Sequence, residues 1–291
     1  MEIAGNTALM IASRDGQTGC IRLLLETDTD VNATNTDGMS ALMLASSMGH
    51  NSSVSLLLHA HADPNLRDTD GMTALMLASR RGYDNSLKIL IIGRADVNLV
   101  SWKKDTALTL ASRYGHDKCV SLLLAAKVNV NVVSRRQSTA LILASRYGHV
   151  DCVRLLITAH ADIHMRNGYG ISALMIACKF KCPNCLRLLL KADGHLNARN
   201  TLRNTALIEA SMVGSKECVA ILIEADADLN AVNNLGFTAL MKASLKGFDG
   251  CVLLLLKANA NVNIKTPSGK TALSLAMEQN KQKCVDLLRA Y

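Results

Sequence analysis

Apolar and polar residues follow one pattern that recurs along the whole chain. The triplet Thr-Ala-Leu or Ser-Ala-Leu returns every 33 residues, without an insertion or deletion. Its first residue is Thr7, Ser40, Thr73, Thr106, Thr139, Ser172, Thr205, Thr238 or Thr271. A strict period of this kind predicts a single array of nine repeats over residues 1–291, and it argues against two unrelated globular domains.

Each repeat predicts two helices and a polar connection. With the Thr or Ser counted as position 0, apolar residues at positions 1, 2, 4 and 5 give one buried face at helical spacing. The hydroxyl can accept amides of the first turn, and Gly at position 9 in seven copies can end the helix. A second helix is indicated by apolar runs such as 119–124 and 152–157. Polar segments such as 62–71, rich in Asn and Asp-Gly turns, predict projecting hairpin-like loops. The fold class is therefore all-α.

The repeated residues resemble the ankyrin repeat family. The similarity is carried by Thr-Ala-Leu-Ile-Leu-Ala-Ser-Arg-Tyr-Gly-His over 139–149, by Cys-Val-Xaa-Leu-Leu in the second helix and by Ala-Asp-Val-Asn over 95–98. Ala replaces the Pro that usually follows Thr in this family, and other residues replace the His that usually follows Leu. The resemblance implies L-shaped helix pairs with β-hairpin fingers, stacked into a curved solenoid that binds partners on its concave side. It implies no chemistry.

The two ends of the array differ in polarity. The last repeat carries polar residues where other repeats are apolar, which predicts a solvated C-terminal cap. These residues are Glu278, Gln279, Asn280, Lys281, Gln282, Lys283 and Arg289. The first repeat shows no comparable replacement, so we expect further sequence upstream of Met1.

Composition favours a cytoplasmic or nuclear protein. The chain is 49% hydrophobic, but its longest leucine-rich run, 251–256, stops at Lys257 and is too short to cross a membrane. Its start has no signal-peptide pattern. Seven of the nine cysteines share position 13, where we expect small buried side chains without disulfides, as in a reducing compartment. They are Cys20, Cys119, Cys152, Cys185, Cys218, Cys251 and Cys284.

Candidate chemistry is sparse. Cys178, Cys182 and Cys185 have a spacing that raises structural zinc as an alternative, with His149 as the fourth ligand, but this His column usually bonds a turn in the family. We therefore expect no metal and no cofactor. Glu209 and Lys242 replace apolar residues at position 4 of adjacent repeats, which predicts a partly buried ion pair. No catalytic triad or phosphate-binding loop is visible, so we expect no enzymatic activity.

The resemblance places partner contacts at the loop tips and at the exposed end of the first helix, positions 29, 30, 32, 7 and 8. Six of the nine aromatic residues and many cations fall there. The predicted partner-binding residues are Arg80, Arg81, Trp102, Lys103, Arg113, Tyr114, Arg135, Arg136, Arg146, Tyr147, Tyr169, Phe180, Met212 and Phe237. Residues 73–204 contain 20 Lys and Arg against 7 Asp and Glu, so the positive charge is concentrated in the middle repeats. Beyond them, Ile171, Leu202, Val213, Leu235 and Leu245 make the same face apolar.

These features predict a monomeric scaffold or adaptor that binds an acidic, partly hydrophobic protein segment. Two alternatives stay open: an anionic ligand such as a phosphoinositide, nucleotide or nucleic acid, or a regulatory array of a larger multidomain protein. The near-identity of 106–116 and 139–149, ten of eleven residues, also allows Arg113–Tyr114 and Arg146–Tyr147 to be echoes of a tandem duplication.

Overall fold

The computed structural model describes residues 5–134 and 136–291. The chain divides into two compact units, Met1–Ala140 with Thr158–Ala161 and Leu141–Ile157 with Asp162–Tyr291. Each unit is described by itself below. The 33-residue period predicts no such boundary, which falls at the start of a helix.

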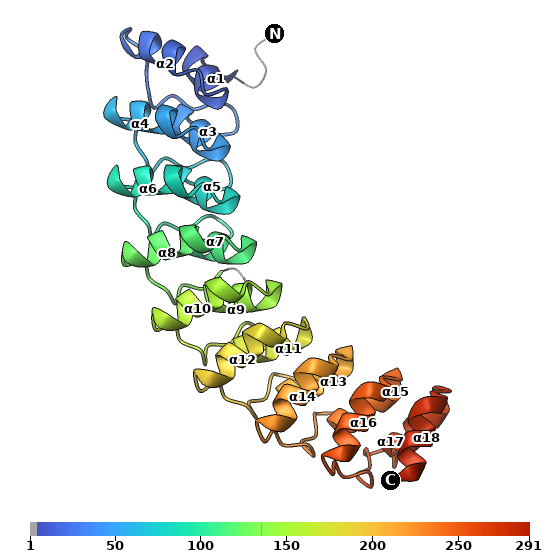
Figure 1. The fold of residues 1–291 in the computed structure, drawn as a ribbon. Helices are drawn as coiled ribbons and strands as arrows, with labels where there is room; N and C mark the ends of the chain where they lie inside the picture. The colour runs from blue at the N-terminus through green and yellow to red at the C-terminus, as the bar shows by residue number, and fades with distance from the viewer. Residues whose placement is uncertain (1–4, 135) are drawn as a thin grey trace. The chain divides into compact units, whose positions relative to one another are not determined.

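Paired helices build the first unit (Figure 1). They are α1 (Ala8–Arg14), α2 (Thr18–Leu25), α3 (Ala41–Met48), α4 (Asn51–His59), α5 (Ala74–Arg81), α6 (Asp84–Ile92), α7 (Ala107–Tyr114) and α8 (Asp117–Ala125). The first helices α1, α3, α5 and α7 pack in succession, and so do the second helices α2, α4, α6 and α8. The predicted helix pairs are therefore present here.

The second unit repeats this arrangement. Its helices are α9 (Ala140–Tyr147), α10 (Val150–Thr158), α11 (Ala173–Lys179), α12 (Pro183–Lys191), α13 (Ala206–Val213), α14 (Lys216–Glu224), α15 (Ala239–Lys246), α16 (Asp249–Lys257), α17 (Ala272–Glu278) and α18 (Gln282–Ala290). Isolated antiparallel bridges join Thr34 to Ser40 and Arg166 to Ser172, and the described residues of the two units form no sheet. The expected all-α class is confirmed, with loops in which strand pairing is minimal.

Helix starts and stops follow the side chains expected from the sequence. The Ser40 hydroxyl accepts the Met43 amide at 3.3 Å, and the Thr205 hydroxyl accepts that of Ile208 at the same distance. Gly82 and Gly214 end their helices in the left-handed conformation. Lys181 stands in for the usual Gly at φ 57°, and Pro183 opens α12 two residues later.

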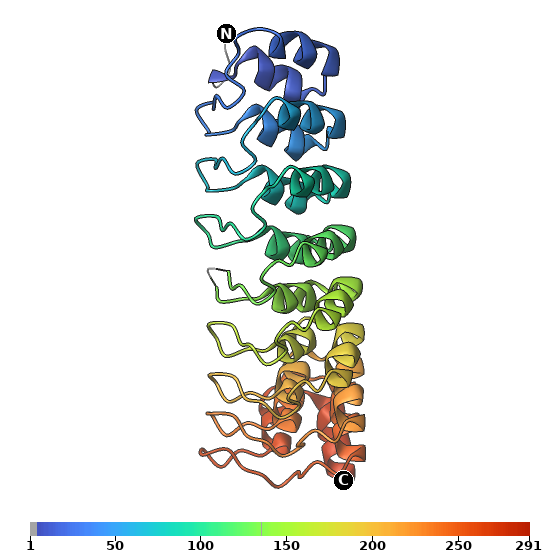
Figure 2. The same ribbon diagram turned by 90° about the vertical axis from the view of Figure 1, so that its left-hand side faces the viewer.

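Loops project from the helix pairs on one side (Figure 2), and a polar side chain closes the turn in those of Asn35 and Asn200. The Asn35 side-chain oxygen accepts the amides of Asp37 and Met39 at 3.0 and 2.8 Å, closing a tight turn. The Asn200 oxygen does the same for Leu202 and Asn204. Asn, Asp, Ser or Thr occupies this position, 28, in every loop between repeats. The loop tips are therefore held in a fixed conformation and can present their side chains to a partner.

The cysteine column is buried, with one exception. Cys185, Cys218 and Cys251 are buried and form no disulfide among the described residues, as expected. Cys20 is exposed, so the prediction that the whole column is buried is wrong at this residue. The reason is that, among the described residues, α1 packs mainly against α2 and α3, and α2 mainly against α1 and α4, so that the side of this helix pair away from α3 and α4 is uncovered.

The last repeat presents its polar residues to solvent. Glu278, Gln279, Asn280 and Arg289 are exposed, and Lys281 is half-buried. Leu275, Val285 and Leu288 of the same repeat are buried. No helix among the described residues is both long and apolar enough to cross a bilayer.

Candidate functional site

The end of a first helix and the loop that precedes that helix lie on one face. The Arg113 guanidinium contacts the Asp105 carboxylate at 2.9 Å in the first unit. Lys270 and Glu278 make the same contact at 2.8 Å in the second unit. These pairs join position 32 of one repeat to position 7 of the next. We call the loop tips and the ends of the first helices the first-helix face of each unit.

In the first unit, this face carries exposed cations and one exposed Tyr. Arg80 and Arg81 end α5 and are exposed. Tyr114 ends α7, is 47% exposed and stacks on His116 with ring centroids 6.4 Å apart. The His116 ring nitrogen lies 3.2 Å from the Arg80 carbonyl oxygen, which is the turn contact implied by the resemblance. Arg113 is half-buried because it pairs with Asp105.

Trp102 dominates a loop tip of the same unit. Its side chain is 65% exposed, and the Arg67 guanidinium carbon lies 5.1 Å from its ring centroid. Neighbouring Lys103 pairs with Asp70 at 3.1 Å, and Arg136 is exposed on the next loop. The predicted site residue Arg135 lies outside the described residues.

In the second unit, Arg146 lies against two aromatic rings. Its guanidinium carbon is 4.6 Å from the ring centroid of Phe180 and 5.6 Å from that of Tyr147. The rings are 40% and 50% exposed. The Arg146 Nε is buried and donates no hydrogen bond to the residues that the structure describes. We call Arg146, Tyr147 and Phe180 the arginine–aromatic cluster.

The other predicted anchors of the second unit differ in exposure. Tyr169 is 65% exposed at a loop tip, whereas Met212 and Phe237 are half-buried. The Lys242 ammonium lies 3.9 Å from the centroid of the Phe237 ring, which covers part of it. Ile171 is buried, so its predicted place on the apolar surface is wrong: the residue packs inward at the base of its loop.

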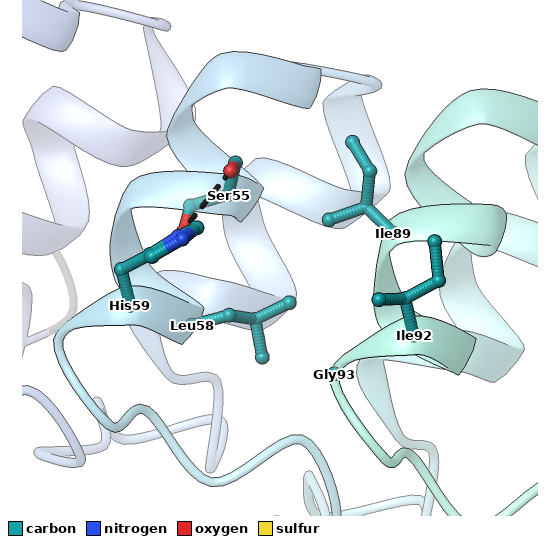
Figure 3. A pocket seen from close by; sticks show the side chains of 6 residues that line it. All are labelled: Ser55, Leu58, His59, Ile89, Ile92 and Gly93. Carbon is teal, nitrogen blue, oxygen red and sulfur yellow. Dashed lines mark hydrogen bonds between the residues drawn. The ribbon is translucent and has the colours of Figure 1, made fainter.

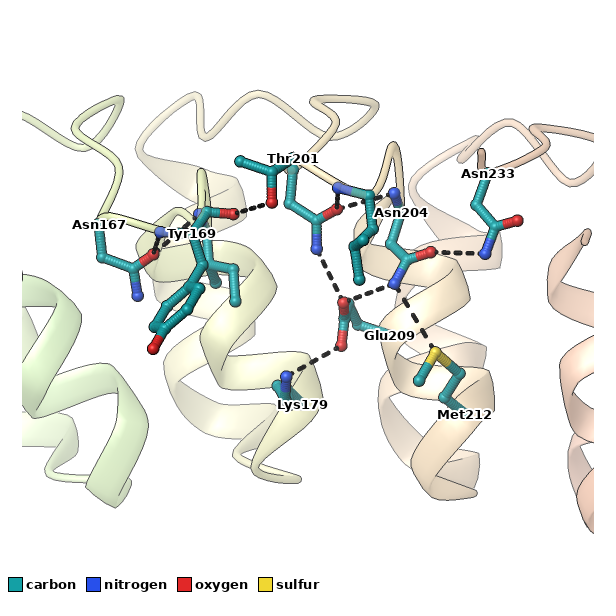
Figure 4. A network of polar contacts seen from close by, with 11 residues as sticks. Asn167, Tyr169, Lys179, Thr201, Asn204, Glu209, Met212 and Asn233 are labelled. Carbon is teal, nitrogen blue, oxygen red and sulfur yellow. Dashed lines mark hydrogen bonds and ion pairs between the residues drawn. The ribbon is translucent and has the colours of Figure 1, made fainter. Parts of the chain in front are cut away.

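The predicted ion pair between Glu209 and Lys242 is also wrong. Glu209 pairs instead with Lys179, whose nitrogen lies 3.8 Å from Oε2 (Figure 4). Lys242 turns to the Phe237 ring. Burial lowers the pKa of Lys242 and the neighbouring Lys246 charge lowers it further, while Glu209 acts in the opposite sense. Position 7 of the preceding repeat therefore supplies the charge partner, in place of position 4 of the following one.

Three asparagines complete this network, and the sequence analysis missed them. The Asn200 and Asn204 amides each donate to Glu209 Oε1 at 2.9 Å. The Asn233 amide donates to the Asn204 oxygen, also at 2.9 Å. The sequence does contain a signal for this network. The loop with Asn at both positions 28 and 32 directly precedes the repeat in which an acidic residue, Glu209, replaces an apolar one.

The three cysteines considered for zinc lie in α11, at the N-cap of α12 and within α12. The described residues contain no group of three or more His, Cys, Asp or Glu side chains placed to hold a metal. Cys178 and Cys185 are buried, and Cys182 is half-buried. Burial, aided by neighbouring groups, raises the pKa of Cys178 well above its usual value. The pKa of Cys218 is lowered to about 7, chiefly by a hydrogen bond with Cys178.

A shallow pocket lies on the second helices of the first unit (Figure 3). It has a volume of about 390 Å³ and is lined by Ser55, Leu58, His59, Ile89, Ile92 and Gly93. A Cβ at residue 93 would lie 2.8 Å from Leu58, so Gly keeps this space open. None of the predicted binding residues lines it.

The comparison with known families agrees with this geometry. A family model described as ankyrin repeats (3 copies) matches residues 2–68, 54–134, 75–167, 141–233, 174–266 and 227–291. No curated protein matches the chain. Ankyrin repeats are protein–protein interaction modules, consistent with exposed rings beside cations on the first-helix faces. The helix pairs, their caps and these matches together show that the chain belongs to the ankyrin repeat family.

Proposed function

We propose that this protein is a non-catalytic scaffold or adaptor that binds an acidic, partly hydrophobic protein segment on its first-helix face. The arginine–aromatic cluster is the observation that carries the proposal. Tyr147 and Phe180 expose large apolar surfaces that the fold does not require at these positions. Clustered exposed rings are typical of the anchors that dominate protein interfaces.

The cluster is preorganised for this role. Arg146 has few ways to reorient, because its guanidinium lies against the Phe180 ring and its Nε is buried. Rings likewise lose little conformational entropy on binding. An acidic side chain of a partner would pair with the guanidinium while an apolar neighbour packs on the rings.

The two similar repeats, which begin at Thr106 and Thr139, differ in the ion pairing of the arginine at position 7. Arg113 is already neutralised by Asp105. At the corresponding place before Arg146 the sequence has Ser138, and Arg146 makes no ion pair among the described residues. Of these two arginines, Arg146 is therefore the one available to an acidic partner, and its surroundings argue that it is more than an echo of a duplication.

Selection from a displayed library of random peptides tests the proposal. We expect enrichment of Asp and Glu next to Leu, Phe or Trp, with an affinity that falls as salt rises. Arg146→Glu should weaken the selected peptides by about tenfold or more, equal to about 1.4 kcal/mol or more. Arg187→Glu, the same charge change at an exposed residue of α12, is the matched control. Enrichment of basic peptides, or equal binding by the two variants, would refute the proposal.

The first unit requires its own variants. Trp102→Ser and Tyr114→Ser remove its exposed rings, and neither substitution replaces a buried residue. Peptides that bind this unit should lose affinity in these variants, whereas peptides specific to the arginine–aromatic cluster should not. Oligonucleotides and phosphoinositide headgroups, titrated in parallel, would reveal an anionic ligand if they bound in place of acidic peptides.

We also infer a monomer in a reducing cytoplasmic or nuclear environment. Support comes from the nine cysteines, which form no disulfide among the described residues. Sedimentation of the reduced protein measures the association state, and fluorescent tagging in cells reports the compartment.

A further inference from the structure

Glu209 is a buried carboxylate at a position that is apolar in seven of the nine repeats. Only 2% of its surface is exposed. Burial of an ionised carboxylate is costly unless hydrogen bonds and an opposite charge compensate both of its oxygens. The partners of the two carboxylate oxygens therefore show whether Glu209 has only a structural role or could also bind a partner.

The two oxygens are compensated unequally. Oε1 accepts the amides of Asn200 and Asn204, both at 2.9 Å (Figure 4). Oε2 is equally buried but accepts no hydrogen bond from the described residues. Its nearest charged partner is the Lys179 nitrogen, and 3.8 Å is too long for a hydrogen bond.

Lys179 is a weakly held partner. Its side chain is 41% exposed, and it is the last residue of α11. An exposed ammonium on a flexible stem gains little from an ion pair of this length, because solvent screens it and its freedom is lost. A stronger donor can therefore displace it from Oε2 at small cost.

We propose that Glu209 Oε2 is the acceptor that recognises a basic side chain of the bound protein segment, with arginine as the best fit. The inference rests on the proposed function and adds to it one cationic residue within an otherwise acidic segment. A guanidinium can donate a short charge-assisted hydrogen bond to Oε2 and stack on an exposed ring such as Tyr169. Lys179, once displaced, can pair with a carboxylate beside that arginine.

The asparagines make the acceptor rigid. Asn204 is itself fixed by Asn233, and the Asn200 oxygen holds the loop amides of Leu202 and Asn204. Glu209 thus cannot turn Oε2 toward another donor without breaking two hydrogen bonds at Oε1. This immobility favours a donor that approaches from the side of Lys179.

Peptides give the first test. Acidic, leucine-containing peptides obtained in the selection above are remade with Arg, citrulline or Met at each position in turn. In the wild-type protein, one register should favour Arg over the neutral citrulline by about tenfold. This preference should vanish in Glu209→Gln and in Glu209→Leu. The second variant restores an aliphatic side chain at position 4, as in Leu44 and Leu77, and circular dichroism checks that it folds.

Methylguanidinium gives a second test that needs no peptide. It should cause saturable shifts in the side-chain amide NMR signals of Asn200 and Asn204, and these shifts should be absent in Glu209→Leu. Lys179→Gln removes the competing ammonium and should tighten this binding, whereas Lys191→Gln, at an exposed lysine of α12, should not. A purely structural carboxylate predicts no such tightening.

The outcomes separate the two proposals. Methylguanidinium shifts without any acidic-peptide binding would refute the proposed function and support the Glu209 site. Acidic-peptide binding with no Arg preference, or shifts that persist in Glu209→Leu, would overturn the Glu209 site and leave the proposed function standing.

Discussion

At the scale of single residues, Asn204 links the polar network of the second unit. It donates to Glu209, accepts from Asn233 and contacts the sulfur of Met212 at 3.7 Å. Removal of the Asn204 side chain takes away the acceptor of the Asn233 amide and leaves Glu209 Oε1 with the Asn200 amide alone, and the loss of hydrogen bonds by these buried groups carries a desolvation cost. Lys179 differs, because solvent can take over its interactions.

Asn204→Ala should therefore lower the free energy of unfolding by about 1–3 kcal/mol. Lys179→Met should change it by less than about 1 kcal/mol, after discounting for solvent exposure. Urea denaturation of the two variants measures both values. Equal losses would contradict this, because they would mean that the ion pair stabilises the buried carboxylate as much as the asparagine does.

Thiol reactivity should separate Cys20 from the buried members of the cysteine column whose pKa is raised, such as Cys185 and Cys251. Burial raises the pKa of Cys185 to about 12 and that of Cys251 to about 11, so few thiolates form there near pH 8. Cys20 is exposed. A disulfide reagent should therefore react fastest with Cys20, and Cys20→Ser should remove the fast phase. Rapid modification of Cys185 in the native protein would contradict the packing of α12.

The same cysteines give a pH dependence of stability. Their raised pKa values mean that the folded state holds its protons more tightly than the unfolded state does. The stabilisation is fully present below the unfolded value of about 9 and is lost as pH rises toward 11 and 12. Cys185→Ala should flatten this alkaline decline in urea titrations, and an unchanged slope would contradict the assignment.

At the scale of elements, helix boundaries could be read from the sequence because their causes are local. A hydroxyl that accepts an amide three residues on and a Gly in the left-handed conformation act within one turn. The partner of Glu209 could not be read in this way. That partner depends on which neighbouring repeat places a cation beside the carboxylate. Lys179 of the preceding repeat does so, whereas Lys242 of the following repeat lies against the Phe237 ring.

Two glycine substitutions should have opposite effects. Gly214→Ala places a Cβ 2.5 Å from the Phe248 ring at φ +68°, so it should cost at least about 1 kcal/mol. Gly19→Ala lies within α2 and meets no atom within 4 Å, so it should gain up to about 1 kcal/mol from helix propensity. Thermal unfolding of both variants checks the signs. Destabilisation by Gly19→Ala would show that α2 is packed differently.

At the scale of the whole molecule, the period predicts the repeats, and the family match confirms them along the chain. It does not predict the two compact units, because every repeat has the same length. The predicted binding residues among those described are exposed or half-buried. Individual neighbours decide their chemistry: Asp105 neutralises Arg113, while two rings hold Arg146.

The proposed role of the last repeat as a cap can be tested by deletion. Removal of residues 271–291 takes away α17 and α18 and uncovers buried residues of the preceding repeat, such as Leu256. The shortened protein should have a lower Tm and should self-associate. The control is an internal deletion of one whole 33-residue repeat, in which the last repeat is kept. A monomeric truncation with an unchanged Tm would contradict the cap.

The central claim is that an acidic segment binds on the first-helix face. Locating a bound peptide on the protein tests it most directly. An acidic, leucine-containing peptide with a paramagnetic label should broaden the NMR signals of Tyr147, Tyr169 and Phe180 on the first-helix face, and spare those of Arg187 on α12. Broadening centred on the second helices, or on the pocket beside Ile92, would contradict the account.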